Sequence, residues 1–289
     1  MKASPYCLPC IIQQVSLTVR KARVYDKLGA SILKDLIDWL PGLDLDRSPA
    51  EIASDCLIRC YKTLGIRDPF KSDKQVQHRY ASKVSDLLRP RLARVSDPLY
   101  LALKCAIGGN LIDSLVLQDK APGFQTSFIY QPPLGINHYH RFQRVLNRSK
   151  NIFYILDNMG EAVFDEWVIN ELRARGKKVT CVVRQKPILN DVIREDARAI
   201  GLNRLGPVIH PDVWAIGLPL HLASARFRKR FRQADLVISK GQANFETLEG
   251  VEKNSLFFCF VVKCDTVARH LGVGVKLGSR VLLQNKPLK

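Results

Sequence analysis

The 289-residue chain lacks the long apolar segment that a membrane-spanning helix requires. Its longest apolar run, from Leu256 to Val262, is far shorter than the roughly 20 residues that cross a bilayer. The N-terminal sequence MKASPYCLPC does not have the basic, apolar and small-residue regions of a signal peptide. We therefore expect a cytoplasmic protein with no membrane partner.

The sequence also lacks the usual signs of a nucleic-acid-binding module. Lys and Arg number 45 against 27 acidic residues, so the net charge is +18. The basic residues are nevertheless scattered, apart from one cluster at 226–232, and the aromatic-interleaved basic motif of a common nucleic-acid-binding module does not stand out. A basic chain is compatible with anionic substrates as well as nucleic acid. We expect nucleic-acid binding to be nonspecific at most, and the sequence does not determine the oligomeric state.

The eight cysteines fall into two groups. Cys7 and Cys10 form a CxxC and Cys56 and Cys60 a CxxxC, so four thiolates are available for a structural zinc ion. Packing on one face of a helix explains Cys56 and Cys60 and is the favoured interpretation, and a reducing cytoplasm disfavours a disulfide. The other four cysteines lie in apolar surroundings and are expected to be buried thiols: Cys105, Cys181, Cys259 and Cys264.

The hydrophobic pattern divides the chain into a helical part and an α/β part. Residues 1–120 have mainly helical spacing, and 121–150 are expected to form a connecting loop and a helix. Residues 151–289 alternate between strand and helix patterns, which is typical of a parallel sheet with helices on both faces. The strands are predicted at 152–156, 179–184, 206–210, 235–239 and 256–262. The helices between and after them are predicted at 162–175, 190–200, 218–233, 244–249 and 264–271.

The α/β part is organised around residues 151–161, NIFYILDNMGE. An apolar run ending at Leu156 leads directly into Asp157, Asn158 and then Glu161. A continuous apolar run is typical of a parallel strand that is covered on both faces. A helical pattern follows, so the acidic turn is expected between the carboxyl end of a strand and the amino end of a helix. Ligands bind at that edge in open α/β sheets.

Two further groups of polar residues follow predicted strands. Arg184 and Asp191 come after the second strand, and Lys240, Gly241 and Asn244 after the fourth. Because the carboxyl ends of parallel strands meet at one edge, we expect these residues to converge with the acidic turn. Taken alone, Asp191 is better explained as a helix cap, and Lys240 as a solvated loop lysine. Their joint occurrence at one edge favours a site.

The chemistry expected at this edge is that of a divalent cation beside a phosphate. Asp157, Asn158 and Asp191 supply oxygen ligands for a hard cation, although helix capping explains the first two about as well. Lys240, next to Gly241, is suited to neutralising a phosphate. A cation there would polarise the phosphoryl oxygens and lower the pKa of an attacking water, so phosphomonoester hydrolysis is the predicted reaction.

Several blocks of the sequence resemble the signature blocks of the metal-dependent damage-control phosphatase family, once catalogued as a domain of unknown function. The N-terminal CLPC and the segment 97–113 are similar to its prokaryotic members. The resemblance spans nearly the whole chain. The other blocks are LDNMGE (156–161), VVRQKPILND (182–191) with EDA (195–197), SKGQANFETL (239–248) and FFCFVVKC (257–264).

This resemblance implies a Rossmann-like α/β/α domain preceded by an all-helical region. It implies one divalent ion, manganese, cobalt, nickel or magnesium, bound by Asp157, Asn158 and Asp191, with Lys240 on the phosphate. The implied substrate is a small phosphorylated metabolite, such as a sugar phosphate or a damaged cofactor. The residues expected near the substrate are Asn110, Asp113, Glu161, Arg184, Gly241 and Asn244. Departures from the family pattern concern substrate choice and occur at Met159, 210–214, Arg226 and Ala243.

Two other functions remain open from the sequence. Some relatives are proposed to transfer a methyl group from S-adenosylmethionine to a carboxylate, but here no GxGxxG follows the first strand. The net charge allows a basic, non-catalytic nucleic-acid-binding protein. Within the phosphatase hypothesis, water is favoured as nucleophile over Asp157, because a carboxylate that binds metal is less free to attack.

Overall fold

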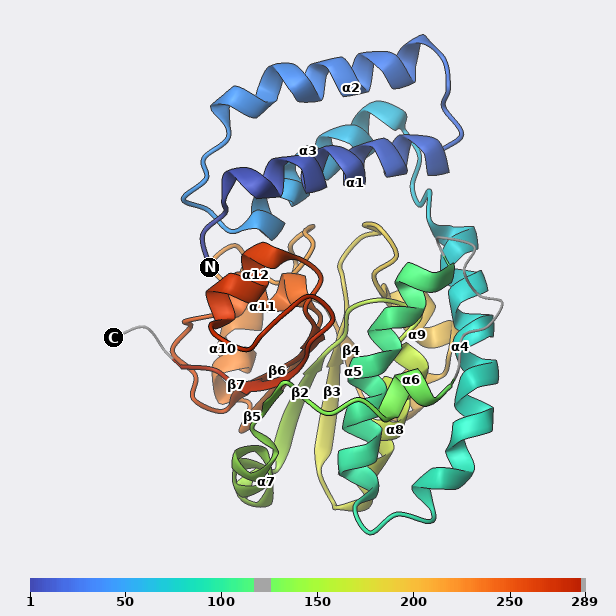
Figure 1. Cartoon of the computed structure of the whole chain (residues 1–289), viewed down its shortest axis with the longest axis vertical. Coiled ribbons are helices and arrows are strands. Elements are labelled where there is room, and N and C mark those ends of the chain that lie inside the picture. Colours follow the sequence, from blue (N-terminus) through green and yellow to red (C-terminus); the bar gives the residue numbers. More distant parts are fainter. Residues whose placement is uncertain (117–125, 287–289) are drawn as a thin grey trace.

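The structure is a computed structural model that describes residues 1–116 and 126–286, with only the backbone for 113–116. Within these ranges, seven strands form one sheet in the order β1-β7-β6-β5-β2-β3-β4 (Figure 1). All neighbouring strands are parallel except β6 and β7. The strands are β1 (Ile136–Asn137), β2 (Asn151–Ile155), β3 (Lys178–Val182), β4 (Val208–Ile209), β5 (Leu236–Lys240), β6 (Leu256–Val261) and β7 (Arg280–Gln284).

Strand β2 lies at the point where the order of the sheet reverses. It pairs with β3 on one side and with β5 on the other, and the chain continues outward from both. Ile152 and Tyr154 face one hydrophobic core, whereas Phe153 and Ile155 face the other. Both faces of β2 are therefore buried, as its unbroken apolar sequence predicts. Such a reversal opens a crevice at the carboxyl ends of the strands.

Helices cover both faces of the sheet (Figure 1). On one face lie α5 (Pro98–Val116), α7 (Tyr139–Arg148), α8 (Ala162–Ala174) and α9 (Arg194–Ala199), with α4 (Lys71–Leu92) and the short α6 (Ser127–Tyr130) beside α5. On the other lie α10 (Ala225–Gln233), α11 (Gln242–Leu248) and α12 (Asp265–Leu271). This confirms the predicted α/β class.

Three N-terminal helices, α1 (Leu8–Lys21), α2 (Lys27–Trp39) and α3 (Pro49–Leu64), form a third layer above the carboxyl edge of the sheet (Figure 1). The start of α3 is specified locally. The Ser48 hydroxyl accepts a hydrogen bond from the Glu51 backbone N–H at 3.3 Å, and Pro49 occupies the first turn. Gly65, with φ +64°, ends the helix in the left-handed region.

Several predicted elements differ in extent from those observed. The predicted helix at 218–233 is shorter, since α10 begins at Ala225, and β1 and β7 were not predicted. Gly108 and Gly109 lie inside α5, at positions where a Cβ would overlap Ile129 or Phe164, so these glycines permit the close approach of neighbouring segments. Because α5 packs on the sheet, the predicted helical and α/β parts share a core. Of the predicted connecting segment 121–150, residues 121–125 lie outside the described residues.

Candidate active site

The acidic turn after β2 is held against the segment that follows β3. The Val192 N–H donates to the Asp157 carbonyl at 2.9 Å, and the Met159 N–H donates to the Asn190 carbonyl at 3.0 Å. These bonds place Asp191 opposite Asn158 as an antiparallel bridge. The convergence predicted from the strand ends is therefore present in the fold.

Helix capping does not explain these residues. Helix α8 begins at Ala162, and Glu161 occupies its N-cap position without a side-chain capping bond. Helix α9 begins at Arg194, and the carboxylate of Asp196 accepts the bond from the Ile193 N–H at 3.1 Å. Asp157, Asn158 and Asp191 are thus buried polar side chains that the helices do not require for their termini.

Arg184 connects the two acidic segments. Its Nε donates to Asp191 Oδ2 at 2.5 Å, and its Nη2 donates to Asp157 Oδ1 at 3.3 Å. Its Nη1 donates to the Gly217 carbonyl at 2.6 Å and to Asn244 Oδ1 at 3.0 Å. Only 3% of Arg184 is exposed, so its guanidinium is buried, and its hydrogen bonds orient the carboxylates of Asp157 and Asp191.

The electrostatics of Asp157 are dominated by burial. Burial, and then the negative charge of Asp191, raise the pKa of Asp157 to about 7, against the opposing charges of Arg184, Lys263 and Lys240. A positive ion between the two carboxylates would lower the free-energy cost of ionising both. The site is electrostatically suited to a cation.

Gly241 permits the closest approach at the site. It has φ +81°, and a Cβ at this position would overlap the Asp157 carboxylate. Asn244, one turn into α11, donates to the Lys240 carbonyl at 2.6 Å and to the Leu156 carbonyl at 3.3 Å. Gly241 and Asn244 therefore fix the end of β5 against the acidic turn.

Lys240 is not among the residues that line the cavity described below. Its Nζ donates to Asp165 Oδ1 at 2.8 Å and to the Ala106 carbonyl at 2.9 Å, and lies 3.2 Å from Glu161 Oε2. Burial lowers the pKa of Lys240, but the two carboxylates outweigh it and raise the pKa above its ordinary value. In this structure the ammonium is engaged with protein groups, so phosphate contact by Lys240 stays a prediction.

Asn110 connects Asp157 with the buried charged residues around Lys240. The Asn110 Nδ2 donates to Glu161 Oε2 at 2.9 Å and more weakly to Asp157 Oδ2 at 3.4 Å. Burial raises the pKa of Glu161 to about 8 in spite of Lys240. The side chain of Asp113, predicted to line the pocket, lies outside the described residues.

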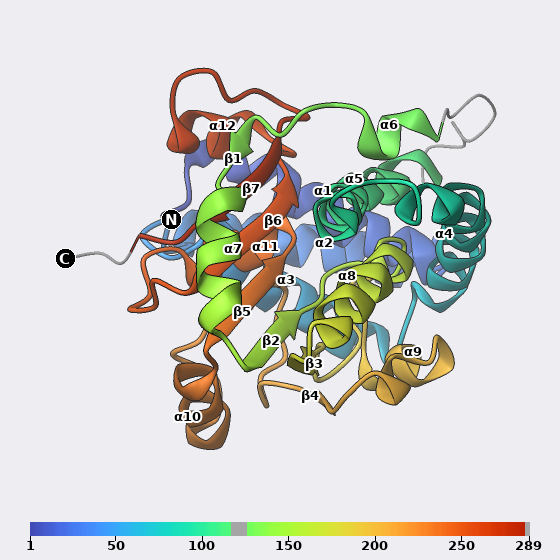
Figure 2. The same ribbon diagram turned by 90° about the horizontal axis from the view of Figure 1, so that it is seen from below.

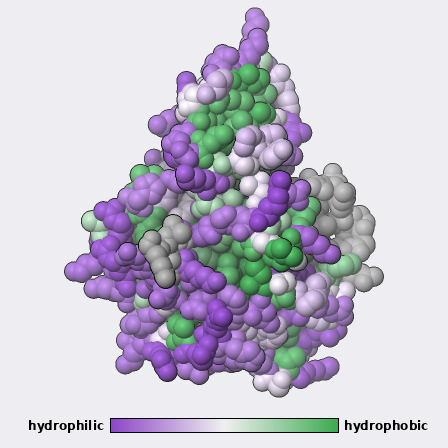
Figure 3. Space-filling view, turned by 60° about the vertical axis from the view of Figure 1, so that its left-hand side comes forward, coloured by the Kyte–Doolittle hydropathy of each residue, from purple (hydrophilic) through white to green (hydrophobic). Residues whose placement is uncertain are grey.

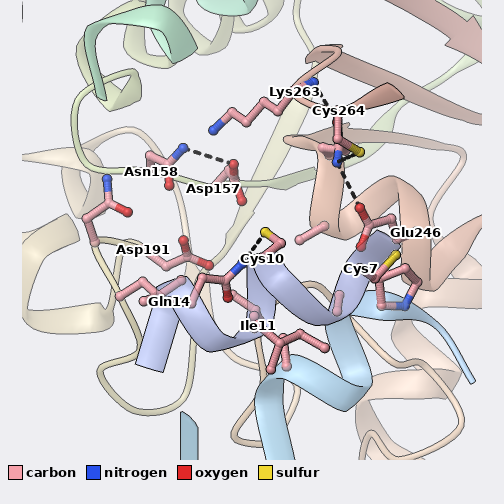
Figure 4. Close-up of a pocket in the computed structure, with 18 of the residues that line it drawn as sticks. Cys7, Cys10, Ile11, Gln14, Asp157, Asn158, Asp191, Glu246, Lys263 and Cys264 are labelled. Carbon is pink, nitrogen blue, oxygen red and sulfur yellow. Dashed lines mark hydrogen bonds between the residues drawn. The ribbon is translucent and has the colours of Figure 1, made fainter. Parts of the chain in front are cut away.

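A cavity of about 300 Å³ opens at this edge, between the sheet and helices α1 and α3 (Figure 4). Asp157, Asn158 and Asp191 line it together with Lys263, whose side chain extends toward Asn158 (Figure 4). Lys263 comes shortly after β6, just as the other site residues follow their strands. The residues after this strand were not considered as site candidates from the sequence, so Lys263 was missed. Gln14 of α1 was missed as well. Asn190, Gln242 and Glu246, which belong to the polar groups after the second and fourth predicted strands, also line the cavity.

The cysteines do not assemble the predicted zinc site. Cys7 and Cys10 line the cavity, whereas Cys56 and Cys60 lie on α3 beside a separate small hollow between the N-terminal helices. Burial raises the pKa of Cys56 to about 11 and that of Cys60 to about 12, as expected for core thiols. Among the described residues no three His, Cys, Asp or Glu side chains are placed to hold one metal.

The divalent cation implied by the family resemblance fits the residues that are present. Two carboxylates and one carboxamide face a single cavity, and such oxygen donors suit a hard cation. Only two of these three oxygen ligands are carboxylates, so a three-ligand site requires the amide oxygen of Asn158 as well. In addition, no helix in the described ranges is long and apolar enough to span a membrane.

Comparison with known proteins places this geometry in a family. Residues 3–277 match the model of the damage-control phosphatase ARMT1-like domain. A damage-control phosphatase of Pyrococcus horikoshii is 35% identical over 82% of each chain, and one of Archaeoglobus fulgidus is 29% identical over 95% of this chain and 97% of that protein. The crystal structure of a DUF89 family protein from P. horikoshii superposes with a TM-score of 0.88 at 32% identity, covering 99% of this chain and 100% of that one.

Proposed function

Since the chain belongs to the damage-control phosphatase ARMT1-like domain family, and is on that ground a phosphatase, we propose that it hydrolyses a small phosphorylated metabolite in a reaction that depends on a divalent cation. One observation carries the proposal. Asp157, Asn158 and Asp191, which come from two strand ends, face the same cavity as Lys263. Oxygen donors for a cation and a positive side chain for a phosphate are thereby brought to one place.

The residues have distinct roles in this proposal. Asp157, Asn158 and Asp191 hold the cation, and Arg184 keeps the two carboxylates in position. When bound, the cation would polarise the phosphoryl group and lower the pKa of an attacking water. Lys263 offsets negative charge on the phosphate, because its ammonium extends into the cavity beside Asn158 (Figure 4).

The cavity supports a small substrate. Its volume of about 300 Å³ is at the lower end of ligand sites. Apolar side chains from α1, α3 and the loop at 187–189 form much of its wall, which suits the carbon skeleton of the leaving alcohol: Ile11, Leu17, Pro49, Ala53 and Leu189. The wall also contains Glu246 and Gln242, which are able to bind hydroxyl groups of the substrate.

Hydrolysis of para-nitrophenyl phosphate by chelator-treated protein tests the proposal. Adding back manganese, cobalt, nickel or magnesium separately is expected to restore turnover with at least one ion. Asp157→Ala is expected to remove that turnover, and Asp86→Ala, at an exposed position on α4, to retain it. Undiminished turnover in Asp157→Ala, or turnover that no ion affects, contradicts the proposal.

A further inference from the structure

The fold collects positive charge that is dispersed in the sequence. Three segments, 139–150, 171–178 and 225–235, contain 13 basic and two acidic residues. Their net charge of +11 (13 minus 2) is more than half of the +18 of the whole chain. Each segment leads into the beginning of a strand: β2, β3 or β5. The charge is therefore concentrated at the amino edge of the sheet, opposite the cavity.

Hydrogen bonds tie the three segments together at that edge. The Lys178 N–H donates to the Lys150 carbonyl at 2.8 Å, and Lys177 Nζ donates to the Ser149 carbonyl at 2.8 Å. Asp235 accepts from the Lys150 N–H at 2.9 Å, and its own N–H donates to the Asn151 carbonyl at 2.9 Å. Figure 2 looks onto this edge, where α7 and α10 flank the strand beginnings. We call these three segments the amino-edge surface.

Helix α7 presents the most regular part of the amino-edge surface. Arg141, Arg144 and Arg148 share one exposed face of the helix, while Phe142 and Leu146 are buried on the other. The three arginines line an open hollow of about 520 Å³. Among the described residues that line this hollow, Asp235 supplies the one carboxylate, and its Oδ2 accepts hydrogen bonds from the backbone N–H groups of Lys150 and Asn151.

We propose that the amino-edge surface binds the phosphate backbone of a nucleic acid without reading its sequence. Nine of its 13 basic residues are arginines, and a guanidinium group can donate two parallel hydrogen bonds to the oxygens of one phosphate. No large apolar side chain is exposed within these segments, all of which are described, so the surface lacks the anchors that a membrane-binding face carries. In the side view of Figure 3, hydrophilic residues predominate around the rim of the lower half of the molecule, and hydrophobic areas lie between them.

The position of the surface is compatible with the phosphatase activity. The cavity opens at the carboxyl edge of the sheet, beneath α1 and α3, and the amino-edge surface lies at the other end of the strands (Figure 1). A bound nucleic acid therefore leaves the cavity accessible to a small substrate. The interaction would localise the enzyme on nucleic acid rather than supply its substrate.

Fluorescence anisotropy with short labelled oligonucleotides of mixed sequence tests the proposal, with RNA and DNA as separate arms. The affinity of the wild-type protein is expected to fall steeply between about 50 and 200 mM salt. The triple variant Arg141→Gln, Arg144→Gln, Arg148→Gln removes up to three phosphate contacts. Its logarithmic salt slope is expected to be smaller by about 2 to 3.

A matched variant separates this surface from overall charge. Lys27→Gln, Lys34→Gln and Lys62→Gln remove the same charge from exposed positions on α2 and α3, at the opposite end of the molecule. This variant is expected to keep the wild-type slope, and both variants are expected to keep wild-type hydrolysis of para-nitrophenyl phosphate, which reports correct folding. Equal loss in both variants, no salt-dependent binding by the wild type, or binding to anionic vesicles but not to oligonucleotides would overturn the proposal.

Discussion

Replacing Gly241 by alanine is a direct test of the site geometry, because a single methyl group must then occupy the space of the Asp157 carboxylate. The glycine has φ +81° and ψ 153°, a combination that is essentially restricted to glycine and costs other residues about 1–3 kcal/mol. The overlap with Asp157 adds to this cost, since all three atoms of the carboxyl group lie too close to the new Cβ. Either the carboxylate or the end of β5 must move.

The consequence for activity is expected to exceed the consequence for stability. A displacement of about 1 Å at a catalytic group can reduce turnover about 100-fold. We therefore expect Gly241→Ala to fold, to unfold at a lower denaturant concentration, and to lose about 100-fold in metal-dependent hydrolysis of para-nitrophenyl phosphate. Calorimetric titration with manganese is expected to show weaker binding in parallel.

Gly176→Ala is the matched control. Gly176 also has a positive φ, +73°, but a Cβ there has no atom within 4 Å. It is therefore expected to show backbone strain without loss of activity. If Gly241→Ala kept wild-type turnover and metal affinity, or if both variants lost activity equally, Asp157 would not be the positioned metal ligand that we infer.

Three further predictions concern charge and metal. Lys240→Met is expected to destabilise the protein by about 3–5 kcal/mol in urea unfolding, because it leaves two buried carboxylates without their cation, whereas Lys83→Met at an exposed site is neutral. Burial raises the pKa of Glu246 from 4.5 to about 7. Between these two values the folded state holds a proton on Glu246 that the unfolded state has released, so stability falls by up to about 3 kcal/mol as the pH rises from 4.5 to about 7. Glu246→Gln is expected to remove this part of the pH dependence and to leave the parts due to Asp157 and Glu161. Manganese at about 100 times its Kd is expected to stabilise the wild type by about 2.7 kcal/mol and to stabilise Asp191→Asn much less.

Each of these has a contrary result. Equal unfolding free energies for Lys240→Met and Lys83→Met would show that the buried ion pairs contribute nothing to stability. A stability profile of Glu246→Gln parallel to that of the wild type between about pH 4.5 and pH 7 would assign the pH dependence to other groups. Equal stabilisation of wild type and Asp191→Asn by manganese would place the ion elsewhere.

The sequence by itself determined the central strand and the donors beside it. An unbroken apolar run predicts a strand buried on both faces, and polar residues directly after parallel strands must meet at one edge. Asp157, Asn158 and Asp191 were identified on these grounds, and the structure brings them to one cavity. Local chemistry is equally informative at α3: the sequence Ser48-Pro49-Ala50-Glu51 has the pattern of an N-cap, a first-turn proline and a capping-box glutamate, and the structure contains that cap.

Tertiary structure decided what each side chain contacts. The ammonium of Lys240 is directed to Asp165 and Glu161, and Lys263 takes the place on the cavity wall. Strand position places a Cα, but the direction of a long side chain depends on which partners the neighbouring helices supply. Tertiary structure also determines that the two cysteine pairs do not meet: Cys7 and Cys10 line the cavity, whereas Cys56 and Cys60 lie beside a separate hollow.

The distribution of charge was also decided by the tertiary structure. In the sequence the basic residues are dispersed, and only the cluster at 226–232 stands out. Three segments separated by about 20 to 50 residues begin neighbouring strands, and parallel pairing brings the beginnings of those strands together. Sequence determines how much charge the chain carries, whereas the strand order determines that most of it lies at one edge.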